Sequence, residues 1–364
     1  MRPLLGYGER LWTPLALCLL LAAIVAAASF GSAGTQRIVT DALIKLVVVV
    51  GTYIFVGNSG VLSFGHIGFM GIGAYVAAWL TIPPETKSFL LPKLPGLLAA
   101  TEWPASLAAV AAGAAAALFA FIVGLPLMRL SGISASIGTF AVLAVVNAVL
   151  SNWTSMTGGQ GSLYGLPSYT NLPVATAWAM LAIVIAWIYQ RTAYGFRLRS
   201  TREDETAAKA AGVDVHRERL IAFVLSAFFV GVSGALYAHF LGVVIAKEFY
   251  LKLTFMSIAM LVIGGLTSLS GAVLGVVVVS SLGELLREVE RGANLGFLTI
   301  PARPGLQEVV LAAALLLILI FRPRGLTAGR ELPPPRRWMA RRLYRHRDPV
   351  PAHPSKADIH GSSA

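Results

Sequence analysis

Residues 191–219, RTAYGFRLRSTREDETAAKAAGVDVHRER, separate two long apolar stretches and decide how the rest of the chain is organised. The segment contains seven Lys or Arg and five Asp or Glu residues, so it lies in water between two membrane-spanning segments. Thr201 and Asp204 fit a capping box, which predicts a short helix over 202–211 that ends at Gly212.

One face of this predicted helix is smooth, because Ala207, Ala208 and Ala211 recur at spacings of one, three and four residues. An isolated helix of this length is marginal in water, since its nucleation is costly. We therefore expect the helix to dock on a partner protein. The alternative is a solvated connecting loop.

The composition identifies a polytopic membrane protein. Of 364 residues, 56% are hydrophobic and only 13% are charged, whereas about a quarter of the residues in a soluble domain are charged. The net charge of +12 resides mostly in short loops and the C-terminal region, where basic residues set membrane orientation. The charge therefore predicts contact with the lipid bilayer and no nucleic-acid partner. Cys18 is the only cysteine, so no intrachain disulfide can form.

Apolar runs of about twenty residues predict an all-α fold of about ten transmembrane helices. If the N-terminus is cytoplasmic, the inner regions hold 20 of the 29 Lys and Arg residues, which predicts that both termini are cytoplasmic. We expect residues 1–328 to form the transmembrane domain and residues 329–364, rich in Arg and Pro, to form a disordered cytoplasmic tail. The expected spans are 11–30, 36–56, 61–81, 105–128, 133–151, 173–190, 220–242, 253–268, 270–288 and 305–321.

Several kinds of chemistry have no support in the sequence. There is no G-x-x-x-x-G-K-[ST] loop to bind ATP phosphates, and the six histidines form no metal cluster. No ionisable residue is expected well inside a span, since Asp41 and Lys45 pair at i, i+4 in the outer half of the second span. This pattern argues against an ion-driven carrier, which needs an ionisable group at mid-membrane.

Two segments match the GxSG element of intramembrane serine proteases. They are Gly57 to Gly60 and Gly231 to Gly234, followed on the same segments by His66 and His239. Seven or six residues along one helix do not bring a serine within hydrogen-bond reach of a histidine. A protease remains the alternative of another class. Close helix packing through small residues is the simpler interpretation of the second segment.

The stretch from Gly57 to His66 also combines polar and small residues. Asn58, Ser59, Ser63 and His66 stand beside three glycines, Gly57, Gly60 and Gly65. Small residues allow close backbone approach, and hydroxyl, amide and imidazole groups can line a water-filled path. The alternative is a satisfied polar patch at the start of a helix.

Three motifs together resemble one family. GNSGVLSFGHIGFMGIGAY at 57–75 resembles the G-x-x-G-x-x-S-x-G-H-x-x-F-x-x-x-G-A-Y pattern of the permease subunits of branched-chain amino-acid ABC transporters. NWTSMTGGQGSLYGLP at 152–167 is similar to the N-x-x-T-x-x-T-G-G-x-x-G-L-x-G-I-P stretch of the M-type permease of the leucine, isoleucine and valine import system. Residues 194–239 resemble its cytoplasmic loop and following helix, and FRPRGL at 321–326 its usual end.

The resemblance, which covers roughly 40–325, implies which residues act. ABC importer permeases carry an E-A-A-x-x-x-G element that docks on the ATPase; here Thr206 stands where Glu is usual, with Glu205 one residue earlier. The candidate coupling residues are Glu205, Ala207, Ala208, Ala211 and Gly212. The candidate substrate path comprises Asn58, Ser59, Ser63, His66, Thr157, Gly158 and Gly159.

The resemblance also implies a transport mechanism and a set of partners. Two permeases, this chain and a second homologous subunit, would form the pore, and two cytosolic ABC ATPase subunits would hydrolyse ATP. A periplasmic substrate-binding protein would deliver the substrate across a bacterial inner membrane. The chain itself would be no enzyme and would bind no cofactor or metal. Branched-chain amino acids are the default substrate, with urea or short-chain amides as the alternative.

Overall fold

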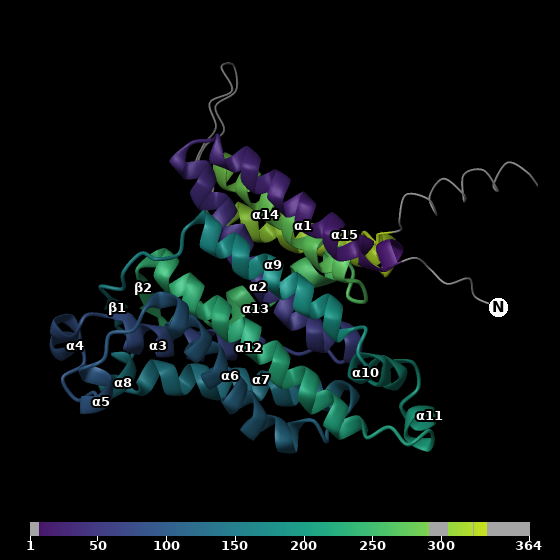
Figure 1. The fold of residues 1–364 in the computed structure, drawn as a ribbon, viewed down its shortest axis with the longest axis horizontal. Coiled ribbons are helices and arrows are strands. Elements are labelled where there is room, and N and C mark those ends of the chain that lie inside the picture. The colour runs from purple at the N-terminus through teal and green to yellow at the C-terminus, as the bar shows by residue number, and fades with distance from the viewer. Residues whose placement is uncertain (1–6, 291–304, 323, 333–364) are drawn as a thin grey trace, which may run out of the picture. The chain divides into compact units, whose positions relative to one another are not determined.

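The computed structural model describes residues 7–290, 305–322 and 324–332. The chain divides into a helical unit of residues 14–331 and a second unit made of 1–13 and 332–364. Of the second unit, only residues 7–13 and Leu332 are described. The helical unit therefore contains nearly all of the described residues (Figure 1).

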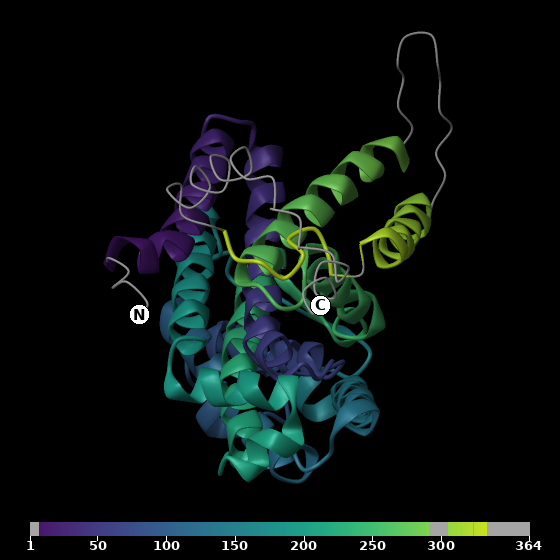
Figure 2. The ribbon, with the colours of Figure 1, turned by 90° about the vertical axis from the view of Figure 1, so that its right-hand side faces the viewer.

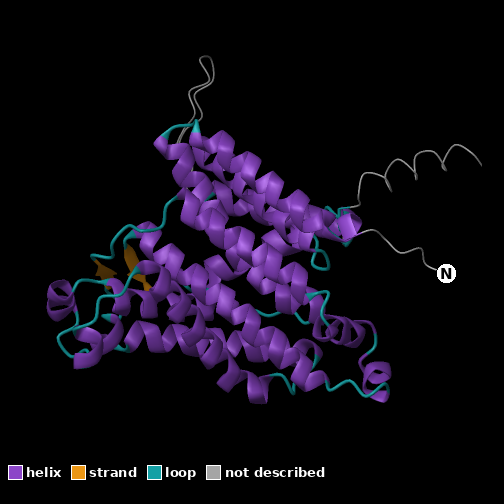
Figure 3. Ribbon diagram, viewed as in Figure 1, coloured by secondary structure: helices purple, strands orange, loops and turns teal. Residues whose placement is uncertain are grey.

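Helices dominate the described residues (Figure 3). The helices are α1 (Tyr7–Ser29), α2 (Ala33–Ser59), α3 (His66–Thr81), α4 (Pro84–Leu90), α5 (Gly96–Ala99), α6 (Ala105–Leu127), α7 (Gly132–Asn152), α8 (Thr154–Thr157), α9 (Leu172–Tyr189), α10 (Ala193–Glu203), α11 (Glu205–Ala210), α12 (Val215–Leu241), the 3-10 helix η1 (Ala246–Glu248), α13 (Leu251–Gly264), α14 (Leu269–Glu290) and α15 (Leu306–Phe321). Two short strands, β1 (Ser162–Tyr164) and β2 (Val243–Ile245), pair in antiparallel register with Leu163 opposite Val244.

Each expected span coincides with one helix of the structure. Seven of the described helices are long and apolar enough to cross a membrane. The helices α3, α13 and α15 also fall on expected spans but have only 16, 14 and 16 residues. The fold is therefore an all-α, multi-pass membrane fold, while the count of ten and the orientation of the termini stay predictions.

The core of the unit forms where α12 packs against α2, α3 and α6 (Figure 1). Backbones meet there without intervening side chains. A Cβ atom on Gly73 of α3 would lie 2.1 Å from the carbonyl oxygen of Gly231, and one on Gly234 would lie 2.0 Å from that of Met70. Helices in lipid gain little from hydrophobic burial, so such close approach supplies the packing contacts that hold them together. The interpretation of the second GxSG segment as close helix packing is confirmed.

Residues 324–331 fold back against the turn between α13 and α14 (Figure 2). The Leu326 amide donates to the Ile263 carbonyl at 2.9 Å, and the Thr327 amide donates to Gly264 at 3.1 Å. The Glu331 carboxylate then accepts hydrogen bonds from the amides of Leu269 and Ser270, at 2.7 and 3.0 Å. The first residues of the expected tail thus hold the start of α14, whereas residues 333–364 lie outside the described part of the chain.

The helix-capping role of Glu331 is open to a stability test. We expect Glu331→Ala to lower the free energy of unfolding by about 1–3 kcal/mol, because two backbone donors at the start of α14 lose a charged acceptor. The midpoint of thermal unfolding in detergent should fall by several degrees. Arg330→Ala, at an exposed neighbouring position, serves as the control and should leave the midpoint unchanged. Equal midpoints for the two variants would contradict the capping role.

Candidate functional site

The coupling unit, residues 191–219, contains two helices where the sequence predicted one. The chain breaks at Asp204, between α10 and α11, so the expected helix over 202–211 was wrong in its start. Asp204 caps α11 by itself, accepting from the amides of Thr206 and Ala207 at 2.9 and 3.0 Å. The Thr201 hydroxyl instead donates to the Leu198 carbonyl inside α10. Thr201 therefore takes no part in a capping box.

The end of α11 follows the prediction. Gly212 has a φ of +82°, in the left-handed region that favours glycine. The amide of Val213 donates to the carbonyl of Ala208 at 3.0 Å, and the amide of Gly212 donates to that of Lys209 at 3.0 Å. This pair of hydrogen bonds is a Schellman motif, which terminates the helix.

The smooth alanine face of α11 is divided between the inside and the surface of the chain. Ala208 is buried, so its methyl group cannot meet a partner, contrary to the sequence-based prediction. Ala207, Ala211 and Gly212 are exposed. Of the predicted docking face, these three residues therefore remain available to another protein.

Glu205 holds α11 against the start of α12. Its carboxylate pairs with Lys209 at 2.8 Å and with the buried Arg219 at 2.8 Å. Hydrogen bonds from Lys209 and Arg219 hold the pKa of the Glu205 carboxyl below its usual range. A depressed carboxyl pKa stabilises the folded state above the ordinary value of about 4, and this contribution is lost only as the pH falls through the lowered pKa. The attachment is thus intact at neutral pH.

A second attachment joins the coupling unit to the end of α2. The Arg202 guanidinium donates from Nη1 to the carbonyl oxygen of Gly57 at 2.8 Å. Its aliphatic stem lies across Gly60, where a Cβ atom would stand 2.5 Å from Cγ of Arg202. Tyr53 lies one helical turn before Gly57 in α2, and its hydroxyl donates to the side chain of Gln190 at 3.1 Å. The two sequence motifs, one in the coupling unit and one at 57–60, therefore meet in space.

The segment between α2 and α3 forms a buried joint, residues 57–66. Asn58, Ser59, Ser63 and His66 are each 1–3% exposed. Asn58 donates to the Ile54 carbonyl, and the Ser59 hydroxyl accepts from the Val61 amide. Four polar atoms of the joint have no hydrogen-bond partner within the described residues: Oδ1 of Asn58, Oγ of Ser63 and both ring nitrogens of His66.

The His66 ring packs among three phenylalanines. The ring centroids of Phe55, Phe69 and Phe223 lie 5.8, 5.9 and 5.6 Å from that of His66. A buried polar atom without a partner costs about 1–3 kcal/mol, so a joint that carries four of them is poorly satisfied in this conformation. Water in the joint or a rearrangement of its backbone would supply such partners.

The outer part of the predicted path lies elsewhere. The Thr157 hydroxyl donates to the carbonyls of Leu150 and Trp153, and Gly158 and Gly159 turn the chain with φ values of +72° and +66°. These residues follow the end of α7. The joint instead packs on the start of α7, where the Ser136 hydroxyl donates to the Leu62 carbonyl at 2.7 Å. Because α7 has 21 residues, about 30 Å separates its two ends. The structure therefore does not bring the two groups of predicted path residues together.

The protease alternative gains no support from the described residues. The Ser233 hydroxyl donates to the Val230 carbonyl of its own helix, and His239 shares a hydrogen bond with Thr81 at 2.9 Å. Ser59 accepts from the backbone, and the ring nitrogens of His66 are unpartnered. Neither serine therefore meets a histidine in the arrangement that activates a nucleophile.

The described residues thus form a multi-pass helical unit in which a short helix with exposed residues is tied to α12 and, through α10, to α2. The family model described as the branched-chain amino acid transport system / permease component matches residues 34–319. The chain belongs to this family. It is thus the permease component of an ABC importer, a multi-pass membrane protein that works with ATPase and binding-protein partners.

Relatives within the family differ in substrate. The chain is 28% identical to the high-affinity branched-chain amino acid transport system permease protein LivM of Escherichia coli, over 88% of this chain and 76% of that protein. It is 24% identical to the guanosine ABC transporter permease protein NupP of Bacillus subtilis, over 73% and 74% of the two chains. It is 30% identical to the autoinducer 2 import system permease protein LsrC of Klebsiella pneumoniae, over 40% and 42%. No solved structure matches the chain.

Sequence reasoning missed Arg202, which ties the coupling unit to α2. We expect Arg202→Ala to reduce substrate transport about tenfold or more, because a charge-assisted hydrogen bond worth about 1.5–3 kcal/mol is lost at the junction. The ATPase subunits should still co-purify, since Arg202 is not on the exposed face of α11. Arg217→Ala, at an exposed position of the same coupling unit, is the control and should transport normally. Equal transport by the two variants would show that the junction does not carry the coupling.

Proposed function

We propose that this chain is a pore-forming permease subunit of a bacterial inner-membrane importer for branched-chain amino acids. It has ten spans with both termini in the cytoplasm, and it pairs with a second homologous permease. Two cytosolic ABC ATPases hydrolyse ATP on its behalf, and a periplasmic binding protein supplies the substrate. The chain is not itself an enzyme and binds no cofactor or metal.

The observation that carries this proposal is the double attachment of the coupling unit. The exposed face of Ala207, Ala211 and Gly212 is free to receive an ATPase, whereas Glu205 and Arg202 fasten the same unit to α12 and α2. A displacement of α11 would therefore reach α2 and α12, two of the four helices that form the core. Closure of the ATPases would move α11, and the poorly satisfied joint at 57–66 is the part of α2 and α3 that rearranges in response.

The substrate assignment rests on the likeness to LivM, which extends over most of both chains. The likeness to the guanosine permease is lower in identity and covers less of this chain. Urea and short-chain amides remain the alternative within the same mechanism. Uptake of labelled leucine by the purified complex in proteoliposomes, with valine, isoleucine, urea and acetamide as competitors, tests the assignment. Competition by urea or acetamide without competition by valine would favour the alternative.

Docking of the ATPase on α11 can be separated from the folding of the permease. We expect Ala211→Trp to abolish co-purification of the ATPases and uptake together, because a bulky side chain holds the partner away from the exposed face; overpacking of this kind costs about 1–3 kcal/mol. Ala208→Trp should instead destabilise the permease itself, since Ala208 is buried. Ser88→Trp, at an exposed position in α4, is the control. Normal ATPase recovery with Ala211→Trp would mean that α11 is only a solvated connector.

The proposed orientation follows from the distribution of Lys and Arg. In a Cys18→Ala background, Thr206→Cys should react with an impermeant thiol reagent only from the cytoplasmic side. Gln160→Cys, in the loop after α8, should react only from the periplasmic side. Labelling of both positions from one side would contradict an arrangement that places the coupling unit in the cytoplasm and the loop at 158–161 outside.

A further inference from the structure

The ion pair of Asp41 and Lys45 lies on α2, with Lys45 close to the middle of the helix. The expected span began at residue 36 and placed the pair in its outer half. The helix α2 runs from Ala33 to Ser59, so Lys45 is the thirteenth of 27 residues. The ammonium of Lys45 lies 2.5 Å from the Asp41 carboxylate. Charged side chains near the middle of a membrane helix are costly and usually serve a function.

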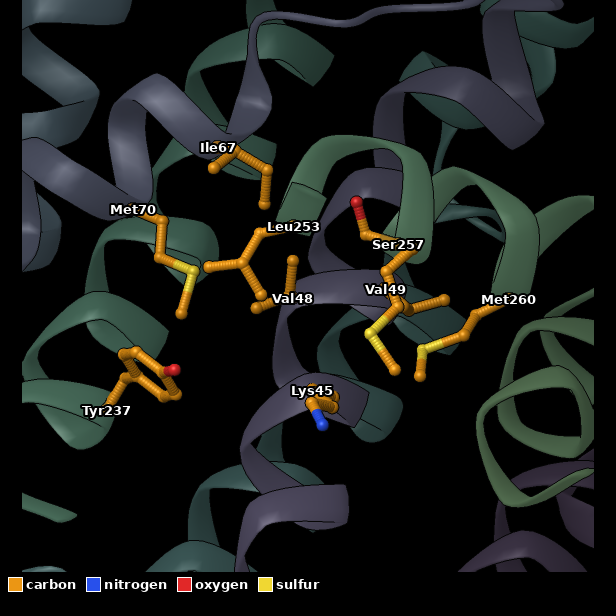
Figure 4. A pocket seen from close by; sticks show the side chains of 10 residues that line it. Lys45, Val48, Val49, Ile67, Met70, Tyr237, Leu253, Ser257 and Met260 are labelled. Carbon is orange, nitrogen blue, oxygen red and sulfur yellow. The ribbon is translucent and has the colours of Figure 1, made fainter. Parts of the chain in front are cut away.

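Lys45 borders a pocket between α2, α3, α12 and α13 (Figure 4). The pocket walls are almost wholly apolar, and three of the side chains are methionines. Two hydroxyl groups, of Tyr237 and Ser257, join Lys45 as the polar lining. The apolar lining includes Val49, Ile67, Met70, Leu253, Met256 and Met260.

The pocket encloses little free space and has partly exposed residues in its wall. Its free volume is about 20 Å³, room for roughly one water molecule. Leu253 and Met256 are partly exposed, so the pocket meets the surface along α13. Methionine side chains are unbranched and flexible, which lets them move aside for a ligand at low cost. A ligand with an aliphatic side chain would thus replace methionine contacts with contacts of the same kind.

We propose that this pocket is the substrate site of the permease for a zwitterionic amino acid with an aliphatic side chain. The ligand's ammonium group would bind Asp41, its carboxylate would bind Lys45, and its side chain would lie among the methionines. The inference rests on the proposed function and deepens it.

A zwitterionic ligand suits this site better than a neutral one, because its two charges can replace both partners of the Asp41–Lys45 ion pair. When the Asp41–Lys45 pair opens around a zwitterion, each buried charge keeps an opposite partner, so no uncompensated charge is left. Urea or an amide carries no net charge on either end and cannot replace the partners of both side chains. Lys45 lines the pocket, whereas Asp41 is not part of the lining and is joined to it through the ion pair with Lys45; the two side chains are 18% and 27% exposed. The pair therefore selects for amino acids over amides.

The decisive test compares single and double neutralisation of the pair in the complete importer. Asp41→Asn and Lys45→Gln should each lower the rate of leucine uptake tenfold or more, since a charge-assisted contact to the substrate is lost. The double variant Asp41→Asn/Lys45→Gln leaves no unpaired charge in the helix and should assemble normally. It should nevertheless stay at least about tenfold impaired.

Controls separate binding from structure. Glu284→Gln/Arg287→Gln neutralises a matched pair on α14, with a separation of 3.1 Å, and should transport normally. Uptake at the wild-type rate by the double variant Asp41→Asn/Lys45→Gln would refute the proposed substrate site. Each of the two charged side chains would then serve only to compensate the charge of the other. Absence of leucine uptake by the unaltered complex would instead refute the proposed function.

A second measurement does not depend on transport or on the charged residues. In a Cys18→Ala background, Ser257→Cys places a small thiol in the pocket wall. Saturating leucine should slow the modification of this thiol in the purified complex several-fold, and urea should not. Equal modification rates with and without leucine would overturn the assignment of the pocket.

Discussion

In the proposed mechanism, the hydrogen bond from the Arg202 guanidinium to the Gly57 carbonyl is the contact that joins the coupling unit to the membrane helices. It joins residues 145 positions apart in the sequence. A carbonyl at the end of a helix has no partner within the helix, so Gly57 has an acceptor to offer. Gly60 leaves room for the stem of Arg202 and ends α2 with a φ of +73°. The water-exposed loop and the buried joint are therefore mechanically one structure.

Backbone contacts at small residues determine which helices would move together with the coupling unit. The helices α3 and α12 touch backbone to backbone at Gly73 and Gly231, and α13 and α14 do the same at Gly264 and Gly271. Contacts of this kind hold helices at fixed separations, because no flexible side chain lies between them. A displacement of α12 by the coupling unit is therefore passed to α3. The joint at 57–66 connects α2 to α3 and contains unpartnered polar atoms, so in the proposed mechanism it is where these two helices would move relative to each other.

The fold was predictable because a bilayer sets the length of each apolar run. All ten expected spans coincide with helices, and the positive φ of Gly212 followed from its place after an alanine-rich turn. Local signals failed where tertiary contacts decide. Ala208 looked like part of an exposed face, yet it packs inside, and Thr201 bonds back to Leu198 within a helix that the pattern did not reveal. Glu331 lay in a segment that composition assigns to a tail, but its carboxylate caps α14.

The candidate path was predictable only in part, since composition identifies polar residues but not their neighbours.

We propose above all that the coupling unit drives the joint through Arg202. The most direct test is the thiol reactivity of Ser63→Cys in a Cys18→Ala background, because Ser63 is buried in the joint. The account predicts that the modification rate changes when the complex binds ATP, and that Arg202→Ala removes this change while ATP is still bound. Two results would contradict this proposal: a modification rate that is the same with and without ATP, or an equal response to ATP in the Arg202→Ala variant.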